Sequence, residues 1–466
     1  MLAAQSGETR MSNMLFTQLM NKRQPLKQGE LPFISVVTPT WNRREFLPYL
    51  LYMFQYQDYP ADRRELVILD DSPESNAELI ASLTRYSPHP ELIRYYHQSE
   101  RMTIGAKRNR VNELARGEYI VCMDDDDFYR ADKLSYTINE MRRHNALFAA
   151  CNVIPIWYSH VNRIFMTNDN GARNVLNGTF AYHRNFLKKH RYDDRATLAE
   201  EEGFTNYFTT PVLLLDPWRS ILCVSHSSNT FDKDFVLGSC EAQRVTLDEA
   251  VPDSFVRKFY QRLHQAPLSQ QPNWAFFHRV VLVGDNAAFR QTLLDGGLSA
   301  TQVEQISLVE NDPRLTHLAV TQRAQRENWP NYLLLDTRLD WVRQQRSIDA
   351  LNNLLRALNH ISWDGFHLAA ELEAGIKLSQ LTGVVSPLVQ ALPHLACCVN
   401  QQGYAPLIER LQDQLTEAGY LNTADLRWFA LYPSMFFRSE DDDGQACTAR
   451  FFRKLGVVPQ AGAQEQ

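Results

Sequence analysis

The sequence lacks the features that mark membrane-spanning, secreted and disulfide-rich proteins. No stretch approaches the ~18 consecutive apolar residues of a membrane-spanning helix, and residues 1–30 lack the apolar core of a signal peptide. The seven cysteines are odd in number and include no Cys-x-x-Cys pair, so neither a disulfide framework nor a zinc site is indicated. We therefore expect a cytoplasmic protein without a transmembrane segment, and peripheral contact with a membrane stays open.

The sequence also lacks an excess of basic residues. The 466 residues carry a net charge of −6, with a pI near 6.1 and no polybasic segment. This charge balance argues against a nucleic-acid partner. With 44% hydrophobic and 22% charged residues, the chain is long enough for two or three domains with substantial cores. Nothing in the sequence indicates the oligomeric state.

The most informative feature that is present is the run Asp124-Asp125-Asp126-Asp127. It follows directly on the apolar stretch 119–123, whose lack of alternation is typical of a strand covered on both faces. Ligands of open α/β sheets bind outside the carboxyl ends of such strands. Because like charges repel and burial disfavours each of them, a divalent cation is the simplest compensation, and oxygen ligands favour Mg²⁺ or Mn²⁺. The alternative is a solvated acidic turn.

Strand and helix patterns alternate along the first half of the chain. Short apolar runs predict strands at 33–38, 66–69, 92–96 and 118–123, with Pro39 ending the first of them. Apolar residues at helical spacing predict helices at 44–57, 76–86 and 105–116. This alternation predicts an α/β fold with a mostly parallel sheet, flanking helices and right-handed crossovers.

Four blocks of the first half resemble family-2 glycosyltransferases in both order and spacing. The blocks are residues 35–43, 65–72, 105–109 and 117–127, and the resemblance extends over 33–240. It implies a GT-A fold, in which a nucleotide-binding sheet holds a nucleotide-diphosphate sugar and a DxD motif holds the metal. We accordingly assign 1–30 to a loose N-terminal extension and 31–262 to a GT-A glycosyltransferase domain.

The resemblance implies a donor site at the ends of the first two strands. The turn from Pro39 to Arg43 would present backbone groups and the Trp41 ring to a base and its ribose. Asp70 would accept hydrogen bonds from uracil N3 or a ribose hydroxyl, with Asp71 in reserve. The expected donor is therefore a UDP-sugar. The structural alternative for these aspartates is a helix cap or an Asx turn.

The resemblance also implies groups for the diphosphate and the metal. Arg108, and after it Lys107, would meet the diphosphate near a helix N-terminus, although helical cations are more often solvated. Alignment with the family pattern makes Asp124 and Asp126 the two DxD carboxylates, which would hold Mn²⁺ or Mg²⁺. Asp125 stands at the variable position and would reach the ribose.

A transferase needs a base for the acceptor hydroxyl, and inverting members of the family carry an acidic pair at this point of the chain. Here the pair falls within Glu200-Glu201-Glu202, and the spacing favours Glu201 as the base beside Glu200, with the register open by one residue. A Glu-rich helix start is the alternative. His226 resembles a late family residue near the diphosphate or metal, although a structural role is the commoner one for a lone His.

The second half resembles family-25 glycosyltransferases more weakly. A Gln- and Pro-rich linker at 263–273 is followed by strand patterns at 279–283 and 331–336 and a helical pattern that begins at Ile348. Asp336 stands where the family has three acidic residues, so two carboxylates are missing. We predict that 274–458 is a second, degenerate GT-A-like domain, or else a helical accessory domain, with an acidic loop at 440–443 and a frayed tail at 459–466.

The expected function is that of an inverting, metal-dependent glycosyltransferase. It would move a hexose or N-acetylhexosamine from a nucleotide-diphosphate sugar to a hydroxyl of a glycan or protein acceptor. One alternative is a sugar nucleotidyltransferase, although the turn after the first strand is not the Gly-rich loop that a triphosphate needs. The other is a non-catalytic carbohydrate-binding or scaffold protein with a relict site.

Overall fold

The structure is a computed structural model, and it describes residues 31–169, 171–227, 229, 233, 240–266, 268–369, 375–378, 380–381, 383–387, 396–413, 426–431 and 434–437. The predicted N-terminal extension, the acidic loop 440–443 and the tail lie outside these residues. The chain divides into two compact units, Met1–Ile156 with Asn168–Val224, and Trp157–Thr167 with Ser225–Gln466. The predicted domain limits stay a prediction.

The first unit is built on a seven-stranded sheet with the order β3-β2-β1-β4-β8-β5-β9. The four strands β1 to β4 run parallel, β8 is antiparallel to both β4 and β5, and β9 is parallel to β5. The α/β fold with a mostly parallel sheet is thereby confirmed. The strands are β1 (Ile34–Thr40), β2 (Arg64–Asp70), β3 (Ile93–His97), β4 (Tyr119–Cys122), β5 (Phe148–Ala150), β8 (Ala181–His183) and β9 (Leu213–Leu214).

The register of the sheet brings the ends of its central strands to one edge. Thr40 pairs with Asp70, and Val37 pairs with Cys122, so the aspartate run begins beside the end of β1. Every residue of β1, β2 and β4 is buried, as expected for strands covered on both faces. One difference from the sequence pattern is that β1 continues through Pro39 to Thr40, since proline is tolerated near a strand end.

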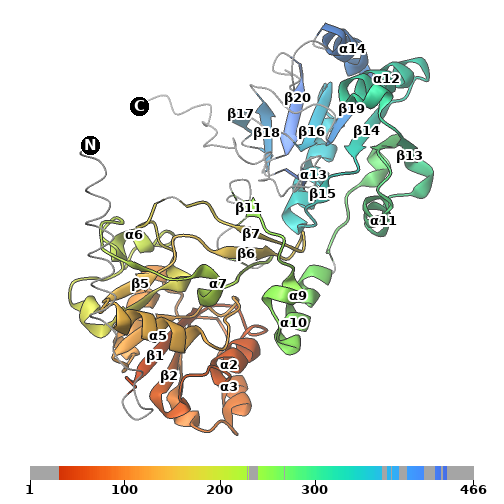
Figure 1. Cartoon of the computed structure of the whole chain (residues 1–466). Helices are drawn as coiled ribbons and strands as arrows, with labels where there is room; N and C mark the ends of the chain where they lie inside the picture. Colours follow the sequence, from red (N-terminus) through yellow and green to blue (C-terminus); the bar gives the residue numbers. More distant parts are fainter. Residues whose placement is uncertain are drawn as a thin grey trace, which may run out of the picture. The chain divides into compact units, whose positions relative to one another are not determined.

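Helices flank this sheet (Figure 1). The helix α4 packs on β1 and β2, and its N-cap Thr103 accepts a hydrogen bond from the Ala106 N–H at 3.3 Å. The three predicted helices are confirmed as α2, α3 and α4. The helices of this unit are α2 (Leu47–Gln55), α3 (Ala77–Thr84), α4 (Ile104–Leu114), α5 (Lys133–Arg143), α6 (Glu201–Phe204) and α7 (Pro217–Ser220).

The second unit contains an eight-stranded sheet with the order β13-β12-β14-β19-β16-β20-β18-β17. Its strands are β12 (Arg279–Val283), β13 (Val303–Ile306), β14 (Asn331–Asp336), β16 (Gly365–Ala369), β17 (Gly375–Lys377), β18 (Val384–Pro387), β19 (Ala396–Asn400) and β20 (Trp428–Leu431). Its helices are α9 (Leu247–Ala250), α10 (Ser254–Gln265), α11 (Ala287–Asp295), α12 (Pro313–Arg326), α13 (Gln345–Leu358) and α14 (Tyr404–Asp413). The predicted strands at 279–283 and 331–336 and the helix around Ile348 are confirmed.

The remaining strands of the described residues form two smaller sheets. One has the order β10-β6-β7-β11, formed by β6 (Pro155–Tyr158), β7 (Arg163–Met166), β10 (Cys223–Ser225) and β11 (Glu241–Ala242). The other pairs β15 (Asp340–Trp341) with β21 (Phe436–Phe437). Residues 263–265 of the predicted linker belong to α10. Among the described residues, no helix has the length and apolar character needed to cross a membrane.

Six strands of the second sheet repeat the winding of the first. In chain order β12, β13, β14, β16, β19 and β20 take the positions that β1, β2, β4, β5, β8 and β9 take in the first sheet. The directions also agree, because β19 is antiparallel to β14 and β16, while β20 is parallel to β16. Strand β14 is therefore the counterpart of β4, and its last residue, Asp336, stands near the place of the aspartate run.

Candidate active site

The aspartates that follow β4 are largely buried. Asp125, Asp126 and Asp127 are only 6%, 9% and 4% exposed. The Asp127 carboxylate accepts the Val224 N–H at 2.8 Å, which ties the run to the end of the unit. This burial excludes the solvated acidic turn that the sequence had left open, and it concentrates negative charge in a region of low dielectric constant.

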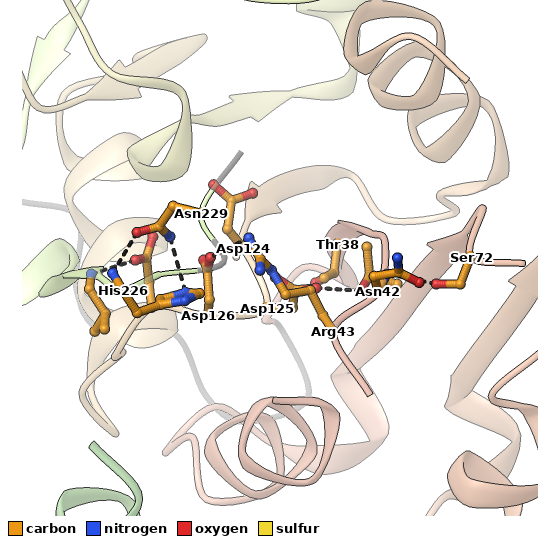
Figure 2. Close-up of polar contacts among 12 residues, drawn as sticks. Thr38, Asn42, Arg43, Ser72, Asp124, Asp125, Asp126, His226 and Asn229 are labelled. Atoms are coloured by element: carbon orange, nitrogen blue, oxygen red, sulfur yellow. Dashed lines mark hydrogen bonds and ion pairs between the residues drawn. The ribbon is translucent and has the colours of Figure 1, made fainter. Parts of the chain in front are cut away.

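Two arginines and a threonine face the run, and Figure 2 shows Arg43 beside Asp125 and Asp126. The Arg43 guanidinium lies 3.9 Å from the Asp125 carboxylate and 3.4 Å from that of Asp126. The Thr40 hydroxyl donates to Asp125, and Arg108 Nη1 lies 3.2 Å from Asp124 Oδ1. Burial raises the pKa of Asp125 well above its usual range, and the charge of Asp126 adds to the rise, whereas Arg43 and Thr40 oppose it.

A tyrosine binds the backbone of the aspartate run, and a buried lysine packs against the ring of that tyrosine. The Asp124 N–H donates to the Tyr129 hydroxyl at 2.7 Å. The Lys133 ammonium is 4.7 Å from the centre of the Tyr129 ring and donates to the Ser220 carbonyl at 2.8 Å. Burial lowers the pKa of Lys133 to about 8. The backbone of Asp124 is thus held by a contact that involves no aspartate side chain.

The three consecutive glutamates that contain the predicted acidic pair differ in their surroundings. Glu200 Oε1 accepts from Arg108 Nε at 2.8 Å and from Asn177 Nδ2 at 3.1 Å. Glu201 begins α6 and accepts the Asn177 backbone N–H at 3.3 Å. Burial raises the pKa of Glu201 to about 7, and the Glu200 charge adds to this rise. Glu202 is exposed. The catalytic role predicted for this pair of residues stays a prediction.

Arg108 joins the aspartates to the glutamates. Its guanidinium contacts both Asp124 and Glu200, at 3.2 Å and 2.8 Å, and the residue is 6% exposed. Burial by itself would lower the pKa of Arg108, but the charges of Asp124 and Glu200 hold it well above the ordinary value. The two predicted halves of the site are thus brought together by one side chain. Its predicted contact with a diphosphate stays a prediction.

Asp70 makes its hydrogen bonds within the protein. Its carboxylate accepts the Ser72 N–H at 2.9 Å, the Asn76 side-chain amide at 2.8 Å and the Tyr95 hydroxyl at 2.7 Å. The bond to Ser72 has the form of an Asx turn, which was the structural alternative for this residue. The residue is also fully buried. A donor-binding role for Asp70 stays a prediction.

Asp71 holds a lysine and an exposed aromatic–arginine pair. The Lys107 ammonium donates to the Asp71 carboxylate and, at 3.0 Å, to the Thr40 carbonyl. Burial lowers the pKa of Lys107, and Asp71 opposes that change. Arg101 Nη1 lies 2.8 Å from Asp71, and its guanidinium lies 4.0 Å from the centre of the Trp41 ring, which is 38% exposed. This pair offers a flat, partly exposed surface at the strand ends.

The turn after β1 is held in place by the next strand. Asn42 adopts a left-handed conformation with a φ of 51°, and its N–H donates to the Ser72 hydroxyl at 2.8 Å (Figure 2). Asn is among the few residues that accept this conformation at low cost. The turn carries the chain from the buried Pro39 to Arg43, so that Arg43 reaches the aspartates.

The predicted metal ligands are not arranged as a coordination site in this structure. Among the residues that the structure describes, no group of three or more His, Cys, Asp or Glu side chains has the arrangement that would hold a metal ion. His226 belongs to the second unit, where its N–H donates to Asn229 Oδ1 at 2.7 Å. Its predicted role beside Asp124 and Asp126 stays a prediction.

Part of the first unit matches a known family model. Residues 35–197 match the model of Glycosyl transferase family 2, which supports the predicted resemblance over that segment. The match ends well before the second unit's sheet, so the predicted likeness of 274–458 to family 25 stays a prediction. The matched segment holds Trp41, Arg108 and the aspartate run, whereas Glu200 and Glu201 follow it directly.

Curated relatives carry glycosyltransferase names. The chain is 28% identical over 118 residues to the putative teichuronic acid biosynthesis glycosyltransferase TuaG of Bacillus subtilis, which is 25% of this chain and 45% of that protein. It is 35% identical over 104 residues to the putative colanic acid biosynthesis glycosyl transferase WcaA of Escherichia coli, which is 22% of this chain and 36% of that protein. The chain thus spans less than half the length of these relatives.

Solved structures align at low similarity. The S. aureus TarS fragment crystallised with UDP-GlcNAc aligns with a TM-score of 0.32 and 16% identity, over 50% of this chain and 71% of that one. The mannosyltransferase PcManGT of Pyrobaculum calidifontis, in complex with GDP-Man and Mn²⁺, aligns with a TM-score of 0.33 and 15% identity, over 56% of this chain and 80% of that one.

Sequence reasoning missed several residues that the structure brings to the site. Arg101 lies in a loop, Lys133 starts α5, and Asn177 belongs to a short turn, so none of them stands in a motif. Their roles come from contacts with residues far away in the chain. Only Lys133 left a signal, because it stands six residues after the aspartate run, whose charge it can help to compensate.

Proposed function

We propose that the protein is an inverting, metal-dependent glycosyltransferase that uses a nucleotide-diphosphate sugar, in the first instance a UDP-sugar. One observation carries the proposal. Arg108 joins a buried aspartate run to a glutamate pair in which one carboxyl has a pKa of about 7. Such a site offers charge for a metal–diphosphate group and, close by, a base for an acceptor hydroxyl.

The residues of the aspartate run fit a hard divalent cation. The donors are carboxylate oxygens, which Mg²⁺ and Mn²⁺ prefer. Burial, and after it the charge of Asp126, raises the pKa of Asp125 despite the opposing charge of Arg43, and a bound cation would offset both causes. Asp124 and Asp126 would hold the cation, which would neutralise the charge that develops on a departing nucleotide diphosphate. Arg43 and Arg108, each already beside a carboxylate of the run, would add positive charge for the phosphate oxygens.

The proposed reaction is a single displacement. The acceptor oxygen forms a bond to the anomeric carbon as the bond from that carbon to the phosphate oxygen breaks, and the bonding electrons leave with the nucleotide diphosphate. The Glu201 carboxylate takes the proton of the acceptor hydroxyl. Because attack and departure occur on opposite faces, the configuration inverts. Glu200, paired with Arg108, keeps the glutamates close to the aspartate run.

A donor-turnover assay tests this function against its alternatives. Release of UDP from a UDP-sugar in the presence of Mn²⁺ supports the glycosyltransferase. Release of pyrophosphate from UTP and a sugar phosphate would identify a sugar nucleotidyltransferase instead. Absence of both reactions across UDP-, GDP- and dTDP-sugars would leave the non-catalytic carbohydrate-binding protein. A cytoplasmic location, a membrane contact and the acceptor belong to the same proposal, and fractionation of cells that contain the protein tests the first two.

Arg101 is proposed to close over the base of the nucleotide. The Arg101→Ala substitution is expected to weaken UDP binding about tenfold, because it removes the cation that Asp71 holds over the Trp41 ring. Calorimetric titration with UDP and Mn²⁺ measures the change. Arg110→Ala, on an exposed arginine of α4, is the matched control and should bind UDP as the parent protein does. Equal affinities for the two variants would contradict the assignment.

The second unit is proposed to be a GT-A-like module that has lost its chemistry. Its sheet repeats the winding of the first, but Asp336 stands alone at the equivalent strand end and its carboxylate forms a two-pronged pair with Arg338, at 3.0 Å and 2.6 Å. An arginine of the same loop thus compensates the buried carboxylate.

Asp336→Asn is therefore expected to leave metal-dependent hydrolysis of a UDP-sugar unchanged, since the first unit carries the site. Equilibrium titration with UDP and Mn²⁺ should give one site per chain both before and after the substitution. Two sites in the parent protein, one of which disappears in Asp336→Asn, would instead identify a bifunctional transferase.

A further inference from the structure

The segment after the acid pair contains an unusual run of left-handed residues. Asn206, Tyr207 and Phe208 have φ values of 50°, 57° and 59°, the longest run of consecutive non-glycine residues with positive φ among those described. Ala199, directly before Glu200, has a φ of 54°. Asn accepts this conformation readily, but Tyr and Phe do so only when their surroundings enforce it. Strained backbone thus flanks the candidate base on both sides.

Hydrogen bonds to α6 enforce this turn. The Thr205 hydroxyl donates to the Glu201 carbonyl at 2.7 Å and accepts the Phe208 N–H at 3.1 Å. The Tyr207 N–H donates to the Glu202 carbonyl at 2.6 Å. Thr205 is buried, and its hydroxyl connects α6 to the turn from inside the protein. The strained residues are therefore fastened to the same short helix that carries Glu201.

The turn places an aromatic side chain in solvent. Tyr207 is 77% exposed, and within the described part of the chain its ring packs against no other aromatic ring. Its neighbour Phe204 is fully buried, in a stack with Tyr192. Leu198, on the other side of the glutamates, is 57% exposed. Packing in the core therefore does not explain the strained backbone conformation of Tyr207. A role of the exposed ring in binding a ligand does explain it.

We propose that Tyr207 is the platform on which a sugar ring of the acceptor stacks. The proposal rests on the proposed function and narrows its acceptor to a glycan. A pyranose has a face of C–H groups edged by hydroxyls, and a tyrosine has an apolar ring with a polar tip, so the two match in chemistry. Hydrogen bonds from Thr205 and Tyr207 fasten the platform to α6, the helix that carries Glu201, and Glu201 is the group that would take a hydroxyl proton from the sugar. Backbone strain fixes where the platform stands.

The test compares Tyr207→Ala with Tyr207→Trp and Tyr207→Phe. The acceptor probes are methyl glycosides of the common hexoses and N-acetylhexosamines. Tyr207→Ala is expected to raise the KM for the glycosides about tenfold, while kcat and the hydrolysis of the UDP-sugar stay at parent values. The two aromatic variants should keep the parent KM. Tyr86→Ala, which removes a tyrosine that is 89% exposed after α3, is the matched control and should change nothing.

A structural role for Tyr207 would have a different signature. If Tyr207→Ala lowered donor hydrolysis in parallel with glycosyl transfer, or left the acceptor KM unchanged, the platform would be wrong. Tyr207→Gly adds a second criterion, because glycine suits a φ of 57°. We expect this variant to melt at a higher temperature than the parent protein while losing the same acceptor affinity as Tyr207→Ala.

Binding without turnover separates this proposal from the function on which it rests. Saturation-transfer NMR with the methyl glycosides and no donor should show contact with the parent protein and loss of contact in Tyr207→Ala. That result without any donor turnover would retain the platform and reject the transferase. Donor turnover by the parent protein, with equal glycoside contact in both proteins or none in either, would retain the transferase and reject the platform.

Discussion

Glu201→Gln is expected to lower kcat by about a hundredfold or more while UDP binding with Mn²⁺ stays close to that of the parent protein. The amide keeps the size of the side chain but cannot accept the proton of the acceptor hydroxyl. Glu202→Gln is the matched control, because Glu202 is the next residue and is exposed. It should retain parent activity. The measurement is steady-state transfer together with calorimetric UDP binding.

The same assignment fixes the direction of the pH dependence. A general base acts when it is deprotonated, and burial raises the pKa of Glu201 to about 7. The value of kcat should therefore fall as the pH is lowered through about 7, and this limb should vanish from the residual activity of Glu201→Gln. Parent-like turnover in Glu201→Gln would move the base to Glu200 or Glu202.

A raised carboxyl pKa also has a consequence for stability. The folded protein holds the Glu201 proton up to a pH of about 7, whereas the ordinary value is 4.5, so ionisation of this group destabilises the fold progressively as the pH rises between these values. Glu201→Gln removes that cost. At pH 8 we expect the variant to be more stable by about 1–3 kcal/mol, and at pH 4 to equal the parent. Denaturant titration at the two pH values measures the difference.

The second large effect concerns the aspartate run. Asp126→Asn is expected to abolish the dependence of UDP binding on Mn²⁺ and with it nearly all transfer, because one of two proposed ligand carboxylates is lost. Parent protein should bind UDP far more tightly with Mn²⁺ than with EDTA, and Asp126→Asn should bind it equally weakly in both. Calorimetry provides the readout.

Two controls make this result specific. Asp336→Asn alters the counterpart strand end of the second unit and should keep the full Mn²⁺ effect. Circular dichroism of Asp126→Asn should match that of the parent protein, since the loop is fixed by Tyr129 and Val224 rather than by the Asp126 side chain. If UDP bound the parent protein equally well with Mn²⁺ and with EDTA, the proposed role of the aspartate run would be wrong.

The sequence predicted the elements that depend on local pattern. The strands that end at Thr40, Asp70 and Cys122 were visible because each is an uninterrupted apolar run, and buried parallel strands have no polar face. The aspartate run was visible because charge directly after such a strand is costly. The end of β1 was misplaced at Pro39, because proline ends most strands but is tolerated in the last residues of one.

The remaining features depend on contacts between distant segments. The role of Arg108 in joining Asp124 to Glu200 requires the loop before α6 to fold back on α4, and no local pattern encodes that approach. The spacing favoured Glu201 but left the register open by one residue, and the contact that distinguishes Glu200 from its neighbours is made with Arg108 of α4, far away in the sequence. A second GT-A-like domain was predicted, but the order of the strands in its sheet was not, because sheet order is set by pairing rather than by succession.

The winding of the sheets also bears on how the chain matures during synthesis. Strand β8 lies between β4 and β5 in the first sheet although it is made after both, and β19 lies in the same way between β14 and β16. Until the later strand leaves the ribosome, the earlier two have open edges facing a gap that only it can fill. Nascent chains halted after β5, or after β16, should thus be held by chaperones and cut by proteases far more readily than chains that include β8 or β19.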